Sequence, residues 1–544
     1  MANDIPQSTG TDRAEDAVAA TSESDAPERG WLGWVVSGTV HAAVLALLAT
    51  IVIQQALDVE TPPRVVEAPP PVQVPEKPKP KDIVEKQKVL EQLKEADVTS
   101  PDTMVEVSDL TPSTEDKVEK EQTLKGREDA LADSEMGGSG LMPAIGAGGG
   151  ARGPFGFRDA GGRIAALKDG GGSRGTEGTM DRGLRWLMRH QDKASGAWNP
   201  VSYPANCDED PKCEPGTRGT GNSEVAMTGY AVLCFLGAGH DHKSAGRYKH
   251  TVEKGLAYLL SQVGADGRFT SARNYEQGIA ATALFEAYGM TQDPALKDAC
   301  EKTLAVILDT QAQDPNAKDA AYAGLGWDYT KANPKRIDSS VSGWNVMALK
   351  SAAMAGFGDA KKGLDGAKVW LKRAWEAANK AKMPEDAYGD SWFPYTWNAT
   401  DDSVQGTNGS NKAHDLTCVG MVCAAFLGHE AGDPMLETMA NHVLKHQKPT
   451  SVAAYNSYYT YYNTLGMFQV GGEKWKEWNA AFSKLLMDMQ VTGQGCLDGS
   501  WNPTDGIGWH GSEVGRVLST TYAILNLQVY YRYKQTQGGK AAPR

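Results

Sequence analysis

The chain has 544 residues, a formal net charge of −13 and a sequence pI near 5.4. This length allows a folded core of a few hundred residues together with extended regions. The acidic balance, and the absence of a basic stripe or an RNA-binding motif, exclude nucleic acid as an expected partner.

The N-terminal part predicts a disordered tail and a membrane anchor. Residues 1–30 are polar and acidic and have too little apolar surface to fold. Residues 31–53 contain no charged side chain and are long enough to cross a bilayer as one helix. We expect a retained anchor rather than a signal peptide, because the segment lacks a charged n-region and a clear cleavage site.

Two polar residues of this anchor, Ser37 and His41, lie four positions apart and therefore on one helical face. With the Pro-rich run that follows, this pattern resembles the TonB-type energy-transducing proteins. The resemblance implies docking on an ExbB–ExbD-like membrane motor, in a bacterial inner membrane, with most of the chain in the periplasm. The alternative is a polar spot near the interface or a generic helix-packing face.

Residues 54–176 predict a linker. The segment 61–81 is Pro-rich and favours an extended polyproline II spacer, whereas 82–96 has apolar residues at helical spacing. The segment 100–176 is first acidic and then Gly-rich, which predicts a flexible tether without specific partners.

From residue 177 to 535 the sequence predicts an all-α domain, followed by a disordered tail at 536–544. Helices with one bulky apolar face are expected at 180–192, 251–262, 296–311, 362–380, 434–448 and 475–490. Helices rich in small residues follow at 225–239, 278–290, 339–356, 416–428, 457–472 and 517–533. Six such pairs predict an (α/α)6 toroid with the small-residue helices inside; an open helical solenoid is the alternative.

A recurring motif supports the repeat. In its best copy Gln191 ends a helix and Gly196 and Trp198 occupy the next turn, and weaker copies end at Phe269, Trp327 and Trp501. This order resembles the QW motif of the prenyltransferase and squalene-cyclase repeat superfamily. The resemblance covers some 350 residues and implies that the Gln secures the Trp of the following loop.

The long links run from the first to the second helix of each pair, so they should gather at one mouth of the toroid. The candidate mouth residues are acidic or aromatic: Glu224, Glu276, Asp338, Asp415, Glu513, Trp327, Trp392, Trp397, Trp501, Trp509 and His510. They can bind a cation or a sugar, or carry out acid–base chemistry. The alternative is that the carboxylates only stabilise the helix N-termini.

Motifs of known chemistry are missing. There is no Asp-x-Asp-Asp acid of squalene–hopene cyclases, and Asp415 and Cys418 do not have the spacing of a prenyltransferase zinc site. We therefore expect no metal and no cofactor. Cys207 and Cys213 form either a local disulfide or two loop thiols.

The function expected from the sequence is a membrane-anchored, extracytoplasmic toroid that binds an unknown ligand or scaffolds a partner, coupled to the motor. The alternative is an enzyme that acts in the toroid cavity, similar to a terpene cyclase or a glycoside hydrolase.

Overall fold

The computed structural model of the chain describes residues 155 and 158 and the ranges 160–216, 221–270, 273–317, 322–381, 393–406, 416–503 and 515–532. The predicted anchor at 31–53, with Ser37 and His41, lies outside them. Among the described residues, no helix combines the length and the apolar character needed to cross a membrane.

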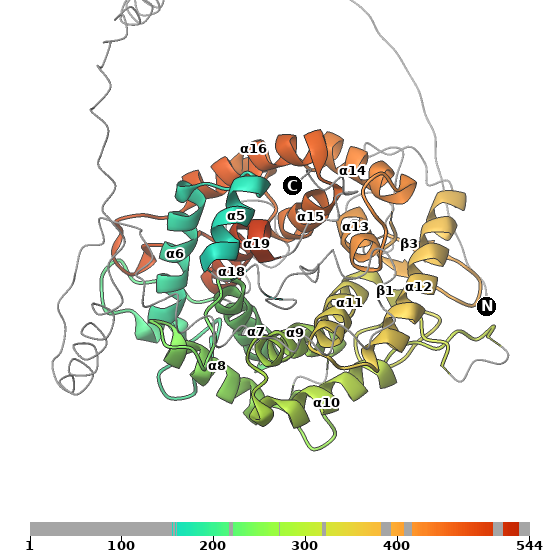
Figure 1. Cartoon of the computed structure of the whole chain (residues 1–544), viewed down its shortest axis with the longest axis horizontal. Helices are drawn as coiled ribbons and strands as arrows, with labels where there is room; N and C mark the ends of the chain where they lie inside the picture. Colours follow the sequence, from blue (N-terminus) through green and yellow to red (C-terminus); the bar gives the residue numbers. More distant parts are fainter. Residues whose placement is uncertain are drawn as a thin grey trace, which may run out of the picture. The chain divides into compact units, whose positions relative to one another are not determined.

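The described residues form two concentric sets of helices (Figure 1). The outer helices are α6 (Arg174–Arg189), α8 (Lys249–Ser261), α10 (Pro294–Asp309), α12 (Ala360–Lys380), α14 (Pro434–His446) and α16 (Gly472–Met489). The inner helices are α7 (Gly221–Gly237), α9 (Asn274–Thr291), α11 (Ser339–Met354), α13 (Thr417–Phe426), α15 (Ser457–Val470) and α18 (Arg516–Leu527). Each outer helix precedes an inner helix in the chain, which gives six hairpins in the described part.

The ring is closed. Each inner helix packs against the next inner helix in chain order, and the last one, α18, packs against α7 and α6 of the first hairpin. We call this junction of the last and first hairpins the seam. The predicted α/α toroid is therefore present, and the open-solenoid alternative is wrong.

Inner and outer helices differ in composition because they differ in burial. In the inner helix α9 nearly every side chain is buried, so its apolar residues need no periodicity. A Cβ added at Gly278 of α9 would lie 3.1 Å from the backbone of Trp344 in α11. The glycine therefore permits the close approach of these two helices. The outer helix α6 is amphipathic and begins with a capping box formed by Ser173 and Thr176.

The packed region begins before residue 177, which corrects the predicted linker boundary. Helix α5 (Ala160–Gly170) packs against α19 (Val529–Arg532). The Arg158 guanidinium is buried and lies 2.7 Å from the carboxylate of Glu286, which also binds Arg532 at 3.0 Å. The Gly-rich composition concealed this buried ion pair, which a mobile tether would not form.

Two of the long links share a small antiparallel sheet, which an all-α prediction did not include. Strand β1 (Ile337–Asp338) pairs with β2 (Thr396–Trp397), and β2 pairs with β3 (Val404–Gln405). The sheet fixes these links beside the N-terminus of α11.

In its best copy the Gln–Trp motif secures the link that follows, as the sequence predicts. The side-chain amide of Gln191 donates to the carbonyl of Gly196 at 2.8 Å and to that of Thr251, in the next outer helix, at 2.9 Å. The Trp198 indole N–H donates to the carbonyl of Leu187 at 2.8 Å. The motif therefore joins one hairpin to the next one.

The motif is repeated at the seam. Gln490 donates to the carbonyls of Gly499 and Thr179, and the Trp501 indole donates to Leu486. In the second hairpin Gln262 contacts only side chains and the neighbouring turn, and Gln277 donates to Gly267 in its place. There the link is held by a glutamine of the inner helix of the same hairpin.

Candidate functional site

Three of the predicted mouth tryptophans are packed inside the ring of helices and their links. Trp327, Trp397 and Trp501 are almost fully buried. Their indole N–H groups donate to the Ile307 carbonyl, the Asp402 carboxylate and the Leu486 carbonyl. The structure therefore places these three predicted mouth residues in packed positions, and each buried indole N–H finds an acceptor.

Three of the five predicted mouth carboxylates, Glu224, Glu276 and Asp338, belong to the described residues. The hydroxyl of Tyr258 in an outer helix donates to Glu224, and Glu276 lies 3.8 Å from Arg273. Five further candidates lie outside the described residues: Asp415, Glu513, Trp392, Trp509 and His510.

Asp338 is the one described candidate that is fully buried at the inner-helix N-termini. Its Oδ1 caps α11 by accepting from the Ser340 and Val341 amides, at 2.9 and 3.1 Å. Its Oδ2 lies 3.2 Å from Arg336, which also pairs with Asp328. Burial raises the pKa of Asp338, and these bonds and Arg336 oppose that rise.

The centre of the ring is filled by an aromatic cluster at this end of the inner helices. Tyr230, Trp344, Tyr461 and Tyr522 come from four different inner helices, and their ring centroids lie 5.1–5.9 Å apart around a closed circuit. The Tyr230 and Tyr522 hydroxyls are 3.1 Å apart. We call these four residues the central aromatic cluster.

Four half-buried tyrosines surround this cluster on the side of the long links: Tyr275, Tyr329, Tyr395 and Tyr458. We call them the tyrosine rim. The Tyr329 and Tyr395 hydroxyls lie 2.9 Å apart, and Arg273 and Arg336 lie 5.2 and 5.4 Å from the centroid of the Tyr329 ring. The Tyr458 hydroxyl is within electrostatic range of Tyr275 and Asp338.

The buried hydroxyl of Tyr458 lacks a hydrogen-bond partner. By contrast, the side chains of Tyr462 and Trp344 each interact with the hydroxyl of Tyr275 through a hydrogen bond. An unpaired buried hydroxyl costs about 1–3 kcal/mol, so the one on Tyr458 calls for an explanation.

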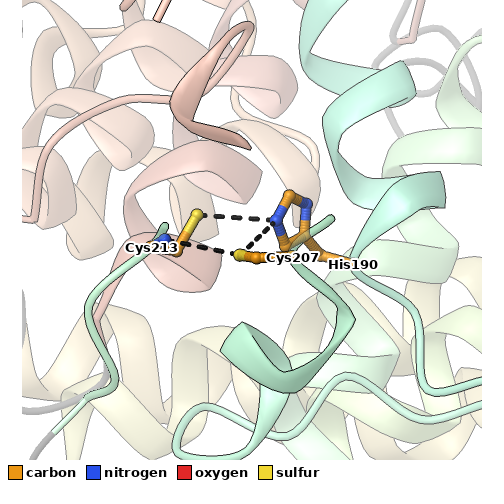
Figure 2. A group of neighbouring side chains, drawn as sticks. All are labelled: His190, Cys207 and Cys213. Carbon is orange, nitrogen blue, oxygen red and sulfur yellow. Dashed lines mark hydrogen bonds between the residues drawn. The ribbon is translucent and has the colours of Figure 1, made fainter. Parts of the chain in front are cut away.

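A second cluster lies at the end of α6, where the sequence predicted no metal site (Figure 2). His190, Cys207 and Cys213 are buried, and their ligand atoms lie within 4.8 Å of one another. All seven cysteines are free thiols, so the disulfide alternative for Cys207 and Cys213 is not realised. Burial lowers the pKa of His190 to about 4 and raises that of Cys213 to about 12.

Comparisons with known proteins give structural neighbours only. No family model and no curated protein matches the chain. Among solved structures it is similar to a GH76A α-1,6-mannanase from Salegentibacter sp. HEL1_6, with 10% identity, a TM-score of 0.44 and coverage of 65% of this chain and 98% of the mannanase.

Two further neighbours have other activities. The cellobiose 2-epimerase of Spirochaeta thermophila DSM 6192 has 11% identity and a TM-score of 0.46, and covers 68% of this chain and 98% of its own. A variant of the type II terpene cyclase MstE from Scytonema has 13% identity and a TM-score of 0.36, with coverages of 68% and 99%.

Proposed function

We propose that the toroid binds a carbohydrate, or a similar polyhydroxylated ligand, at the tyrosine rim above the central aromatic cluster. The observation that carries this proposal is the unpaired hydroxyl of Tyr458 in the tyrosine rim, beside the paired hydroxyls of Tyr329 and Tyr395. A sugar supplies a hydroxyl group for this donor and an apolar C–H face for the aromatic rings.

The central aromatic cluster also favours this ligand class over an isoprenoid. Its four rings, from four different inner helices, pack against one another at centroid distances of 5.1–5.9 Å. A polyisoprenoid chain needs a deep apolar cavity there, whereas a sugar can lie on the rim without entering the ring.

Binding can be tested by isothermal titration calorimetry of the purified chain with α-1,6-mannotriose, cellobiose and maltotriose. Tyr458→Phe keeps the aromatic ring and removes the unpaired hydroxyl. It should weaken binding by about five- to tenfold, the value of one hydrogen bond. Tyr531→Phe is the control, because Tyr531 is buried on α19 and its hydroxyl interacts with Glu177 rather than with the rim. Absence of binding, or full affinity in Tyr458→Phe, contradicts the proposal.

A second candidate is acid-catalysed turnover of the same ligand, with Asp338 as proton donor. The supporting observation is a buried carboxyl with a raised pKa, in electrostatic range of Tyr458. Asp338→Asn preserves the helix cap but removes the acid. It should abolish product formation in chromatography of the same sugars while leaving calorimetric affinity within a few-fold; unchanged turnover contradicts the catalytic role.

A further inference from the structure

The cluster at the end of α6 has the donor types and the burial of a closed metal site. It contains one imidazole and two thiols, and all three side chains are buried. Thiolate sulfur together with imidazole nitrogen is the ligand set that selects zinc(II) in structural sites. Neither the central aromatic cluster nor the tyrosine rim uses these side chains.

The separations of the donor atoms agree with tetrahedral coordination. His190 Nε2 lies 3.3 Å from the sulfur of Cys207 and 3.5 Å from that of Cys213 (Figure 2). Zinc–nitrogen bonds of about 2.0–2.1 Å and zinc–sulfur bonds of about 2.3 Å at a tetrahedral angle separate nitrogen and sulfur by about 3.5 Å. Only a small adjustment of the side chains is needed to take up the ion.

The surroundings of His190 orient it as a ligand. Its Nδ1 lies 2.8 Å from the carbonyl of Trp186, so the ring proton is on Nδ1 and the Nε2 lone pair is directed at the thiols. The Trp186 indole stacks on the imidazole at a centroid distance of 4.2 Å. A carbonyl that fixes the second nitrogen is the usual outer partner of a metal-bound histidine.

A third thiol, Cys496, reaches the cluster from the last hairpin. It lies in the 3-10 helix η7 (Gly495–Leu497) and is buried. Its backbone carbonyl accepts from the Trp186 indole at 2.9 Å and from the Cys213 thiol at 3.5 Å. Its own thiol donates to the carboxylate of Asp208 at 3.4 Å, accepts from the Glu209 amide at 3.3 Å and interacts with the thiol of Cys207. Cys496 lies outside the group of ligand atoms within 4.8 Å of one another, so its side chain has to leave Asp208 to complete the coordination.

We propose that His190, Cys207, Cys213 and Cys496 bind one zinc(II) ion that fastens the last hairpin to the first at the seam. Three ligands belong to the first hairpin and its link, and the fourth, Cys496, belongs to the link of the last hairpin. Three thiolates and one imidazole leave a net negative site, and Arg516 lies within electrostatic range of both His190 and Cys213. The ion therefore stabilises ring closure rather than the sugar site.

The test uses the purified full chain, with metal content measured by inductively coupled plasma mass spectrometry. We expect about one zinc ion per chain. Cobalt(II) substitution should give thiolate-to-cobalt charge-transfer absorption and the intense visible bands of a tetrahedral ion. A chelator should lower the melting temperature, and zinc, but not magnesium, should restore it; this arm does not depend on the folding of any variant.

The Cys207→Ser/Cys213→Ser double variant should lose the metal, and Cys496→Ser should lower the charge-transfer intensity by about a third. The control is Cys300→Ser, which removes a buried thiol of α10 and should keep the full metal content. Equal zinc in the double variant, or a Cys207–Cys213 disulfide without metal in the unaltered chain, overturns the proposal. Unchanged cobalt absorption in Cys496→Ser overturns Cys496 as fourth ligand.

Discussion

The side-chain amide of Gln490 donates to the backbone carbonyl of Thr179 over 2.8 Å, although 311 positions separate the two residues in the sequence. The same amide donates to Gly499 at 3.0 Å, and its oxygen accepts from Arg182 at 2.8 Å. This one side chain repeats at the seam the contact that Gln191 makes between the first and second hairpins.

Replacement of Gln490 by Ala should therefore weaken ring closure. The substitution leaves two buried carbonyls and one arginine without this partner, so we expect a loss of about 2–4 kcal/mol in the free energy of unfolding. Urea denaturation followed by circular dichroism measures it. Gln262→Ala is the matched control, since that motif glutamine bonds only to exposed partners and should cost under about 1 kcal/mol. Equal effects of the two substitutions refute the fastening role.

The Gly196→Ala variant tests how tightly a link packs on the next outer helix. Gly196 has a φ of +80°, and an added Cβ would lie 2.5 Å from the carbonyl oxygen of Lys254. Gly432 has a φ of +90° but no atom within 4 Å of such a Cβ. Gly432→Ala should cost about 1–2 kcal/mol for backbone strain alone, and Gly196→Ala clearly more. Melting curves of the two variants compare them, and equal costs would refute the packing.

The Arg158→Met variant tests whether the folded domain extends before residue 177. The substitution leaves the buried carboxylate of Glu286 with Arg532 alone, and breaking a buried ion pair costs about 3–5 kcal/mol. The measurement is urea unfolding of the purified chain. Arg185→Met removes an arginine that forms an exposed pair with Asp181, and should change stability by under about 1 kcal/mol. A similarly small effect of Arg158→Met would indicate that the folded domain begins near residue 177, as the sequence predicts.

Lys350 makes stability depend on pH. It is buried in α11, and burial lowers its pKa to about 7. Above that pH the unfolded chain holds a proton that the folded chain has released, so stability rises with pH until the unfolded lysine also titrates. Between pH 7.5 and 9.5 the unaltered chain should gain about 2 kcal/mol relative to Lys350→Met. Unfolding free energies at several pH values measure this, and parallel profiles would contradict it.

The repeat was predictable because its signals are local. A helix, a glutamine at its end and a Gly-x-Trp turn lie within twenty residues, so the best copy correctly identified that Gln191 holds the link that carries Trp198. The bond of the same amide to Thr251 in the next hairpin was not predicted. The degraded second copy gave a wrong prediction, because the link carbonyl of Gly267 is held by Gln277 and not by the motif residue Gln262. No local pattern reveals that exchange.

The sites were less predictable because they join distant segments. Nothing in the spacing of Cys207 and Cys213 indicates that His190 and Cys496 lie beside them. The sequence predicted that the mouth tryptophans contact a ligand, because aromatic residues in loops often bind ligands. Here Trp327 and Trp501 are buried, and the indole N–H of each bonds to the outer helix of its own hairpin.

Closure of the ring has a consequence for synthesis on the ribosome. The N-terminal hairpin emerges first, but Trp186 bonds to the carbonyl of Cys496, and α6 packs on α18. Until the last hairpin has been translated, the first one exposes an apolar face that chaperones recognise and that other nascent chains can capture. A chain that terminates before residue 490 therefore lacks the inner helix α18 that closes the ring, and leaves the first hairpin unprotected at the seam.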